Sequence, residues 1–258
     1  MVTVVKIGGS TFGAQDTTIA DIVALQRKDV SLVIVHGGGS LVSEWLSREG
    51  TATRFVRGER VTDRATLDVA TAVLAGLANK ELVAAVNNAG GRAVGISGVD
   101  GALVRAQVKN EEIGYVGAVD KIDAALLETL LGDGFIPFVS PISLNATGDT
   151  SVPQMLNVNG DVIAGEIAAA IGADKLIFLT DVPGIRDESG KLLPDLAAGE
   201  VGALVDSGVA SGGMIPKINA CLRALGGGTT ITRIIDGRQP HALLSELEGH
   251  GAGTTIHE

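Results

Sequence analysis

The sequence predicts an α/β protein, a three-layer αβα sandwich around a central, mainly parallel sheet. Short apolar runs alternate with segments of helical apolar spacing along the whole chain. Glycines number 36 in 258 residues, about twice the usual ~7% share, and many stand where a predicted strand ends. Hydrophobic residues make up 45% of the chain and the mean hydropathy is +0.34, which is enough for a large core.

Charge and composition exclude several classes of partner. The net charge is −10 and aromatic residues are only 3%, so neither a basic patch nor a stacking platform for nucleic acid or anionic membranes is expected. The single cysteine, Cys221, excludes an internal disulfide and a paired-cysteine metal site. No leader sequence and no apolar run of ~18 residues is apparent, so we expect a cytoplasmic protein without a membrane span.

The first half of the chain alternates strands and helices. We expect strands at 3–7, 32–35 and 93–97, and helices at 19–26, through Trp45 and at 64–86, the last capped by Thr62 or Asp63. The segment 54–61 is irregular and basic. The segments 102–108 and 115–121 alternate like antiparallel strands, so we expect a hairpin flap there.

The second half continues the alternation without a linker or a repeat. We expect strands at 136–140, 176–179, 231–235 and 254–256, a loop at 145–152, and helices at 123–131, 161–171, 216–225 and 242–247. Gly172 would end the buried helix 161–171. Two lobes that share one sheet fit this pattern, with residues 1–172 in the first lobe and residues 173–258 in the second.

Glycine-rich strand ends are the first candidate binding elements. Gly8 and Gly9 follow the first predicted strand, and Gly38 and Gly39 lie after the second. Ligands of parallel sheets bind beyond the carboxyl ends of the strands, and glycine lets backbone N–H groups approach an anion closely. Lys6 would add a mobile charge at the same edge, although alone it could be a surface lysine beside an ordinary turn.

A few polar residues complete the candidate site. Arg60 could bind a carboxylate through two hydrogen bonds or could be solvated. Asn157 and Asn159 alternate with apolar residues and face one side, where they could bind a ligand or cap the next helix. Asp161 begins that helix, where the dipole favours a carboxylate, and Lys217 begins another helix. Lysines, amide nests and an aspartate together suit phosphoryl transfer.

Other familiar sites are absent from the sequence. There is no G-x-G-x-x-G fingerprint, P-loop or nucleophile elbow. The run from Asn157 to Asp161 resembles the start of an EF-hand loop, but Val162 and Ala168 stand where glycine and glutamate are required. The histidines have no partners at metal-ligand spacing, and we interpret His36 as a hydrogen-bonded strand-end residue. We therefore predict no metal site built from side chains.

Six motifs, read together, resemble the amino acid kinase family. They are Lys6-x-Gly8-Gly9, His36-Gly37-Gly38-Gly39, Arg60-Val-Thr-Asp63, Asn157-Val-Asn159-Gly-Asp161, Asp181-Val-Pro-Gly184 and Gly213-Met-Ile-Pro-Lys217. They occur in the family's order along essentially the whole chain. Gly160 is a departure, since the family often has alanine there. Within the family, the sequence is most similar to the branch that phosphorylates N-acetylglutamate.

The resemblance implies ATP-dependent phosphorylation of the side-chain carboxylate of N-acetyl-L-glutamate, a step of arginine biosynthesis. Residues 1–172 would bind the amino acid substrate and form a dimer, and residues 173–258 would bind ATP. Mg²⁺ would be held mainly by phosphates and water, and no nucleic acid or membrane would take part. The implied catalytic residues are Lys6, Lys217 and Asp161; the implied substrate-binding residues are Gly38, Gly39, Arg60, Asn157 and Asn159; the implied nucleotide-binding residues are Gly8, Gly9, Asp181, Gly184 and Gly213.

Three alternatives stay open. A related kinase acts on aminoadipate or glutamate held on an acidic carrier protein, which an acidic chain matches poorly. The segment 54–63 and the paired asparagines also resemble the free-substrate enzyme more closely. Other members phosphorylate aspartate, glutamate or UMP. A non-catalytic binding protein on this fold is the third alternative, but binding alone does not require Lys6, Asp161 and Lys217 together.

The long helix at 64–86 predicts a homodimer. Its small and aliphatic residues cover more than one stripe; they are Ala70, Val73, Leu74, Leu77 and Ala78. A two-fold pairing of like helices would bury both faces, unless both pack within one subunit. In the family, arginine-controlled members carry an extra N-terminal helix. Because the first strand starts at Val2 or Thr3, we expect no inhibition by arginine.

Overall fold

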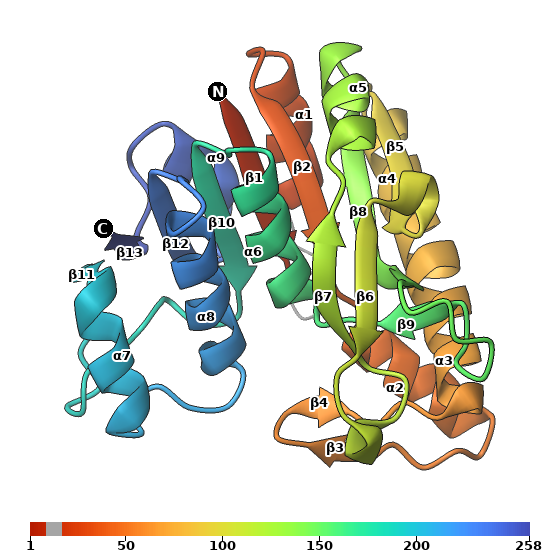
Figure 1. The fold of residues 1–258 in the computed structure, drawn as a ribbon. Coiled ribbons are helices and arrows are strands. Elements are labelled where there is room, and N and C mark those ends of the chain that lie inside the picture. The colour runs from red at the N-terminus through yellow and green to blue at the C-terminus, as the bar shows by residue number, and fades with distance from the viewer. Residues whose placement is uncertain (9–16) are drawn as a thin grey trace.

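The computed structural model describes residues 1–8 and 17–258, and its architecture is one large sheet between two helical layers (Figure 1). The strands of this sheet are β1 (Val2–Ile7), β2 (Ser31–His36), β5 (Ala93–Gly98), β6 (Val104–Val108), β7 (Gly117–Ile122), β8 (Ile136–Asn145), β9 (Met155–Asn157), β10 (Lys175–Thr180), β11 (Asp195–Ala197), β12 (Ile231–Asp236) and β13 (Gly253–His257). A separate small hairpin joins β3 (Phe55–Val56) and β4 (Glu59–Arg60). The predicted α/β sandwich is confirmed.

The helices agree closely with the periodicity of the sequence. They are α1 (Thr18–Gln26), α2 (Gly39–Arg48), α3 (Arg64–Thr71), α4 (Asn79–Asn88), α5 (Ala125–Gly132), α6 (Gly160–Ala170), α7 (Ala198–Asp206), α8 (Met214–Leu225) and α9 (Ala242–Leu247). The sequence did not indicate α7 or β11. The predicted loop at 145–152 is present, and β8 extends five residues beyond Ser140 before it.

Strand β1 lies in the middle of the sheet and is parallel to both neighbours. Lys6 pairs in register with Phe178 of β10 on one side and with Val35 of β2 on the other. Because these strands run in the same direction, their carboxyl ends share the lower edge of the sheet in Figure 1. The sheet therefore brings Lys6, the glycines after β2 and the end of β10 to one edge.

Alternate side chains of β1 enter two different cores, as the two-residue period of a strand requires. Val5 packs in a core with α1, α4 and α9, whereas Val4 packs in a core with α5, α6 and α8. Both cores include residues on either side of position 172; Val5, for example, shares its core with Ile177. The hydrophobic cores therefore run through both proposed lobes.

The hairpin of β6 and β7 is part of the main sheet. The two strands are antiparallel as predicted, but Arg105 of β6 also pairs with Leu144 of β8. The expectation of a free flap was therefore wrong. The sequence showed the alternation of the hairpin but not the strand beside which it would lie.

The long helix predicted at 64–86 is interrupted in the structure. A π-helix, Ala72–Ala78, lies between α3 and α4. The wider turn of a π-helix changes which side chains face inward, and such turns are frequent at functional sites. Here Asn79, directly after the π-helix, is fully buried against the sheet.

Helices α6 and α8 cross in close contact in front of the sheet (Figure 1). A Cβ atom on Gly165 of α6 would lie 2.7 Å from the carbonyl oxygen of Ala220 and 2.8 Å from its Cα. These are backbone atoms of α8 and could move only if the helices separated. Gly165 therefore sets the distance between the two helices.

We predict that Gly165→Ala lowers the free energy of unfolding by about 1–3 kcal/mol, the usual cost of overpacking a core. The matched control is Gly202→Ala in α7, where an added Cβ atom meets nothing within 4 Å. Replacing a mid-helix glycine there should raise stability by about 0.5–1 kcal/mol. Chemical denaturation of both variants checks this. Equal effects in the two variants would show that the crossing is not closely packed.

Candidate active site

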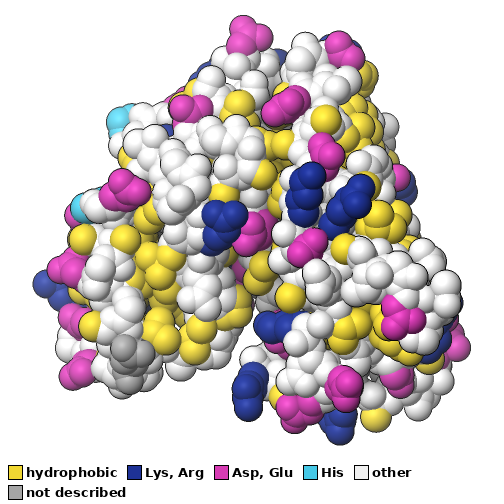
Figure 2. Space-filling view, viewed as in Figure 1, with side chains coloured by type: hydrophobic (Ala, Val, Ile, Leu, Met, Phe, Trp, Pro, Cys, Tyr) yellow, Lys and Arg dark blue, Asp and Glu magenta, His cyan; other side chains and the backbone are white. Residues whose placement is uncertain are grey.

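Two cavities open at the carboxyl edge of the sheet, on either side of Asp161. The first, about 210 Å³, lies toward β2, the β3–β4 hairpin and β9. The second, about 420 Å³, lies between the loop after β10 and the start of α8. Figure 2 shows this side of the molecule as a deep notch between the part that carries α7 and α8 and the part that carries the β3–β4 hairpin.

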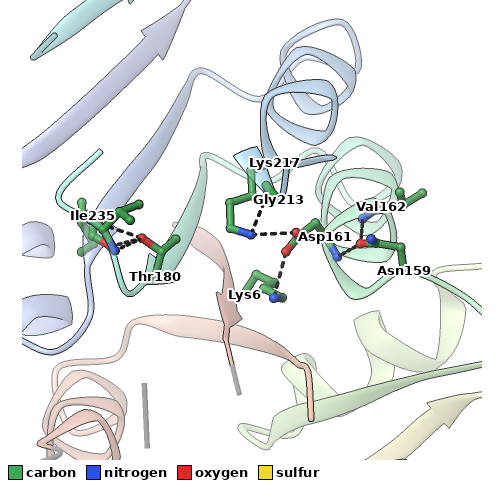
Figure 3. Close-up of polar contacts among 9 residues, drawn as sticks. Lys6, Asn159, Asp161, Val162, Thr180, Gly213, Lys217 and Ile235 are labelled. Atoms are coloured by element: carbon green, nitrogen blue, oxygen red, sulfur yellow. Dashed lines mark hydrogen bonds and ion pairs between the residues drawn. The ribbon is translucent and has the colours of Figure 1, made fainter. Parts of the chain in front are cut away.

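Asp161 joins the two cavities through two ion pairs (Figure 3). Its Oδ1 lies 2.9 Å from the Nζ of Lys6, and its Oδ2 lies 2.9 Å from the Nζ of Lys217. The carboxylate of Asp161 and the ammonium of Lys6 are almost completely buried, and that of Lys217 is largely buried. Lys217 also donates to the carbonyl of Gly213 at 3.2 Å. Two cations are thus held around one anion.

Asp161 stays ionised in this setting. Burial alone would raise the pKa of its carboxyl group, but the charges of Lys6 and Lys217 and their hydrogen bonds outweigh burial and hold the pKa below its ordinary value. Asp161 lies in the first turn of α6, where the positive end of the helix dipole also favours a carboxylate. It is therefore a fixed negative charge between two lysines.

Arg60 supplies a buried cation to the first cavity. Its Nη2 donates to the carbonyl of Gly39 at 2.6 Å and to Ser43 Oγ at 2.8 Å, and the ring of Phe55 lies 4.9 Å from its guanidinium carbon. Burial lowers the pKa of Arg60 somewhat from its very high ordinary value, so the side chain remains charged. Among the described residues no carboxylate forms an ion pair with it, so a ligand carboxylate could do so.

Both asparagines line the first cavity, as predicted. Asn159 Oδ1 accepts from the backbone N–H groups of Asp161 and Val162, so it caps α6. The amide nitrogen of Asn157 donates to Thr62 Oγ1 at 3.3 Å. The two interpretations of Asn159, cap and cavity residue, are therefore compatible: its oxygen holds the helix that carries Asp161.

The second cavity is shaped by the turn after β10. Thr180 Oγ1 accepts from the N–H of Val182, and its single proton is shared between the carbonyls of Val182 at 2.8 Å and Ile235 at 3.2 Å, which folds the turn back on the strand. Gly184 has a φ of +144°, and a Cβ atom there would lie 2.5 Å from Thr254 Oγ1. Only glycine fits this position. Asp181, Gly184, Gly213 and Lys217 all line this cavity.

Most of the predicted site residues thus lie around the two cavities. Among the described residues the exception is Gly8, which follows β1. The N–H of Gly8 donates to the carbonyl of Leu179 at 3.2 Å, and Gly8 is not among the lining residues of either cavity. Gly9 lies outside the described residues. A phosphate-binding role for these two glycines stays a prediction.

Sequence reasoning missed the apolar walls of both cavities. Val42, Phe55, Ala70 and Leu74 line the first, and Val182, Ile185, Val209 and Met214 line the second. In sequence these residues look like ordinary core positions. Phe55 is the one with a signal, since it is a large apolar residue inside an irregular, basic segment.

The described residues do not fit a metal site built from side chains. They contain no group of three or more histidine, cysteine, aspartate or glutamate side chains placed to hold a metal ion. Both oxygens of Asp161 are already paired with lysines.

Comparison with known proteins agrees with this geometry. The model of the amino acid kinase family matches residues 1–236. Acetylglutamate kinase of Dehalococcoides mccartyi is 46% identical over 256 residues, covering 99% of this chain and 94% of that protein. Acetylglutamate kinase of Nostoc sp. is 45% identical over 261 residues, covering 98% of this chain and 86% of that protein. The resemblance inferred from the motifs is confirmed.

Solved structures support the same placement. The protein smu.665 of Streptococcus mutans matches with a TM-score of 0.84 at 27% identity, over 99% of this chain and 98% of that one. Carbamate kinase of Giardia lamblia, at 14% identity and a TM-score of 0.72, covers 100% of this chain and 98% of its own and shares the fold. The motifs, the fold and the full-length relatives agree: this chain belongs to the amino acid kinase family.

Proposed function

We propose that the protein is an ATP-dependent kinase that converts N-acetyl-L-glutamate into N-acetyl-L-glutamyl 5-phosphate. The observation that carries the proposal is the buried Lys6–Asp161–Lys217 group, which lies where two cavities meet. The acetylglutamate kinases that resemble the chain over nearly its full length support the choice of substrate. The N-acetylglutamate synthase of Neisseria gonorrhoeae, solved with N-acetyl-glutamate bound, shares the fold at 26% identity, with a TM-score of 0.86 over all of this chain and 59% of that one.

The reaction needs charge compensation more than proton transfer. A side-chain carboxylate is ionised near pH 7 and can attack the γ-phosphorus of ATP without a general base. A carboxylate O–P bond forms, the P–O bond to the β-phosphate breaks, and ADP leaves. Attack of an anion on an anion is opposed by repulsion, which Lys6 and Lys217 relieve from fixed positions.

The two substrates occupy different cavities. N-acetylglutamate binds in the first, with a carboxylate on Arg60 and contacts from Gly38, Gly39, Asn157 and Asn159. ATP binds in the second, along Asp181, Gly184 and Gly213, with Gly8 and Gly9 near its phosphates. Residues 1–172 then supply the amino acid side and residues 173–258 the nucleotide side. Lys6 and Lys217 act at the boundary.

Mg²⁺ accompanies ATP in this proposal, bound by phosphates and water rather than by a cage of side chains. Phosphate-bound Mg²⁺ would neutralise charge on the nucleotide. We also propose a cytoplasmic location, in keeping with the biosynthetic enzymes that the chain resembles.

A hydroxylamine trapping assay tests the proposed reaction directly, because acyl phosphates form coloured hydroxamates. We expect ATP-dependent hydroxamate with N-acetylglutamate and much less with glutamate or aspartate. Clear turnover of another carboxylate, or only of a carrier-bound amino acid, with none of N-acetylglutamate would reject the proposed substrate. ATP binding without any turnover would favour the binding-protein alternative.

We predict that Lys6→Ala and Lys217→Ala chiefly lower kcat. Each lysine compensates charge that develops in the transition state, so each loss should cost about 3–4 kcal/mol, or about 10²–10³-fold. Lys28→Ala is the control, because Lys28 forms an ion pair with Glu248 on the surface, away from both cavities. Steady-state kinetics that showed equal losses in all three variants would contradict these roles.

Arg60→Ala should chiefly raise the KM for the amino acid, because a carboxylate contact present in both ground and transition states contributes to binding. Loss of a charge-assisted contact should cost about 1.5–3 kcal/mol. The KM for ATP is the internal control and should stay nearly constant. If only the KM for ATP rose, the assignment of the two cavities would be reversed.

We also propose a homodimer formed through α2 and the long helix. The helix Arg64–Asn88 is long and apolar enough to cross a membrane by length and composition alone, and only 28% of its most apolar 18-residue window is buried. Its other face packs on β5, β8 and α2, so the exposed strip is one-sided, as at a protein interface. Trp45, Val69, Ala72 and Leu77 line a largely apolar depression on this strip.

The expected interface lies on a different face of the helix from most of the residues that the sequence suggested. Ala70, Val73 and Leu74 are buried within their own subunit, whereas Ala72 is exposed. We predict a mass near twice 26.2 kDa by light scattering. Ala72→Glu should give monomers, because a charge would enter an apolar two-fold contact. Ala203→Glu, on exposed α7, should remain dimeric. A monomeric wild type would remove this proposal.

A further inference from the structure

Asn79 lines neither cavity, but both polar atoms of its side chain form hydrogen bonds near the carboxyl edge of the sheet. It is completely buried where the π-helix meets α4. Its Nδ2 donates to the carbonyl of Phe138 at 2.9 Å and to the Nε2 of His36 at 3.0 Å. Its Oδ1 accepts from Lys80 Nζ at 3.0 Å. One amide thus connects the end of β2 to an inner residue of β8.

The hydrogen bond from Asn79 fixes the tautomer of His36. An amide nitrogen can only donate, so Nε2 of His36 accepts and its ring proton lies on Nδ1. Nδ1 is 2.9 Å from the carbonyl oxygen of Gly37, to which it donates. Burial, with smaller contributions from the charges of Lys6 and Lys80, lowers the pKa of His36 to about 4, so the ring is neutral at ordinary pH.

Holding the carbonyl of Gly37 also orients the next amide. The peptide bond between Gly37 and Gly38 is planar and trans, so the N–H of Gly38 points opposite to the carbonyl of Gly37. The N–H of Gly37 donates in turn to the carbonyl of Ile7 at 3.0 Å. Both polar groups of Gly37 are therefore fixed, and all three glycines of this segment line the first cavity.

The π-helix packs against the same glycine segment. Gly38 has a φ of +148°, and a Cβ atom there would lie 2.7 Å from the Cδ2 of Leu74 in the π-helix. On the opposite side of Asn79, a Cβ atom on Gly95 would lie 2.0 Å from Asn79 Oδ1. Strand β5 thus leaves space for the amide of Asn79, and the π-helix packs against the glycine that follows β2.

We propose that Asn79 and His36 are positioning residues that aim the N–H of Gly38 at an anionic group of the amino acid substrate. Asn79 holds the ring of His36, and the ring holds the peptide between Gly37 and Gly38. The inference rests on the proposed function, since it assumes that an amino acid carboxylate occupies the first cavity. A purely structural role, in which Asn79 only attaches α4 to the sheet, is the alternative that the experiment must separate.

Asn79→Leu and Asn87→Leu form a matched pair. Asn87 lies on the same helix, α4, as Asn79. Its side chain forms hydrogen bonds to the backbone of Ala93, at the end of β5 away from the site. Both variants should lower the melting temperature. Only Asn79→Leu should also raise the KM and the calorimetric Kd for N-acetylglutamate, by about tenfold, with the KM for ATP unchanged. A loss of stability alone in both variants would overturn the proposal.

Two substitutions of His36 test the chain of hydrogen bonds from Asn79 through His36 to Gly37, even if Asn79→Leu does not fold. Asparagine can place a donor where Nδ1 was and so keep the bond to Gly37, but it loses the bond to Asn79. Glutamine can keep a bond to Asn79 but loses the bond to Gly37. The proposal predicts a rise of about tenfold or more in the KM for N-acetylglutamate for His36→Gln, and a smaller rise for His36→Asn, which keeps the bond to Gly37 but is no longer held by Asn79. The reverse order would contradict the proposal, because the bond to Gly37 is the contact that orients the N–H of Gly38.

Wild-type enzyme separates failure of this inference from failure of the proposed function. If wild type neither binds nor phosphorylates N-acetylglutamate, the proposed function is wrong. The variants are then compared on the carboxylate that wild type does phosphorylate in the same hydroxamate panel. If wild type is active on any carboxylate and the Asn79 and His36 variants do not raise the KM for it as predicted, the positioning role alone is rejected.

Discussion

The structure depends on a carboxylate that holds two lysines in a buried site. Two ammonium groups close together repel each other, and each loses hydration on burial, so neither would stay in place alone. Asp161 supplies the missing charge to both at 2.9 Å. Removing it would leave two uncompensated cations. Much of the fold serves this contact: β1 is central in the sheet, and α6 and α8 cross at Gly165 without a side chain between them.

In the proposed reaction, this arrangement would allow phosphoryl transfer without a general base. The lysines approach from opposite sides, Lys6 from the cavity that contains Arg60 and Lys217 from the cavity behind the turn after β10. A phosphoryl group that passes between the cavities would meet positive charge throughout. Because Asp161 fixes both lysines in the free protein, little reorganisation is needed during the reaction.

Much of the fold and many of the candidate site residues could be predicted from local sequence. Periodicity gave nearly every helix and strand, and glycines marked the active edge. Contacts between distant segments could not be read in this way. That Lys217 reaches Asp161 depends on a helix crossing, and the motif resemblance rather than spacing suggested it. The π-helix was missed because its residues continue the apolar pattern of α3, and Asn79 was missed because only that wide turn faces it inward.

The most direct test of the central claim is the Asp161→Asn variant, measured by steady-state kinetics together with thermal unfolding. Asparagine keeps the shape of aspartate but not the charge that holds the lysines. The account predicts a fall in kcat of about a hundredfold or more, KM values for both substrates within a few-fold of wild type, and a cooperative, lowered melting transition. A folded variant with nearly wild-type kcat would contradict the account, because it would show that the lysines need no anion between them.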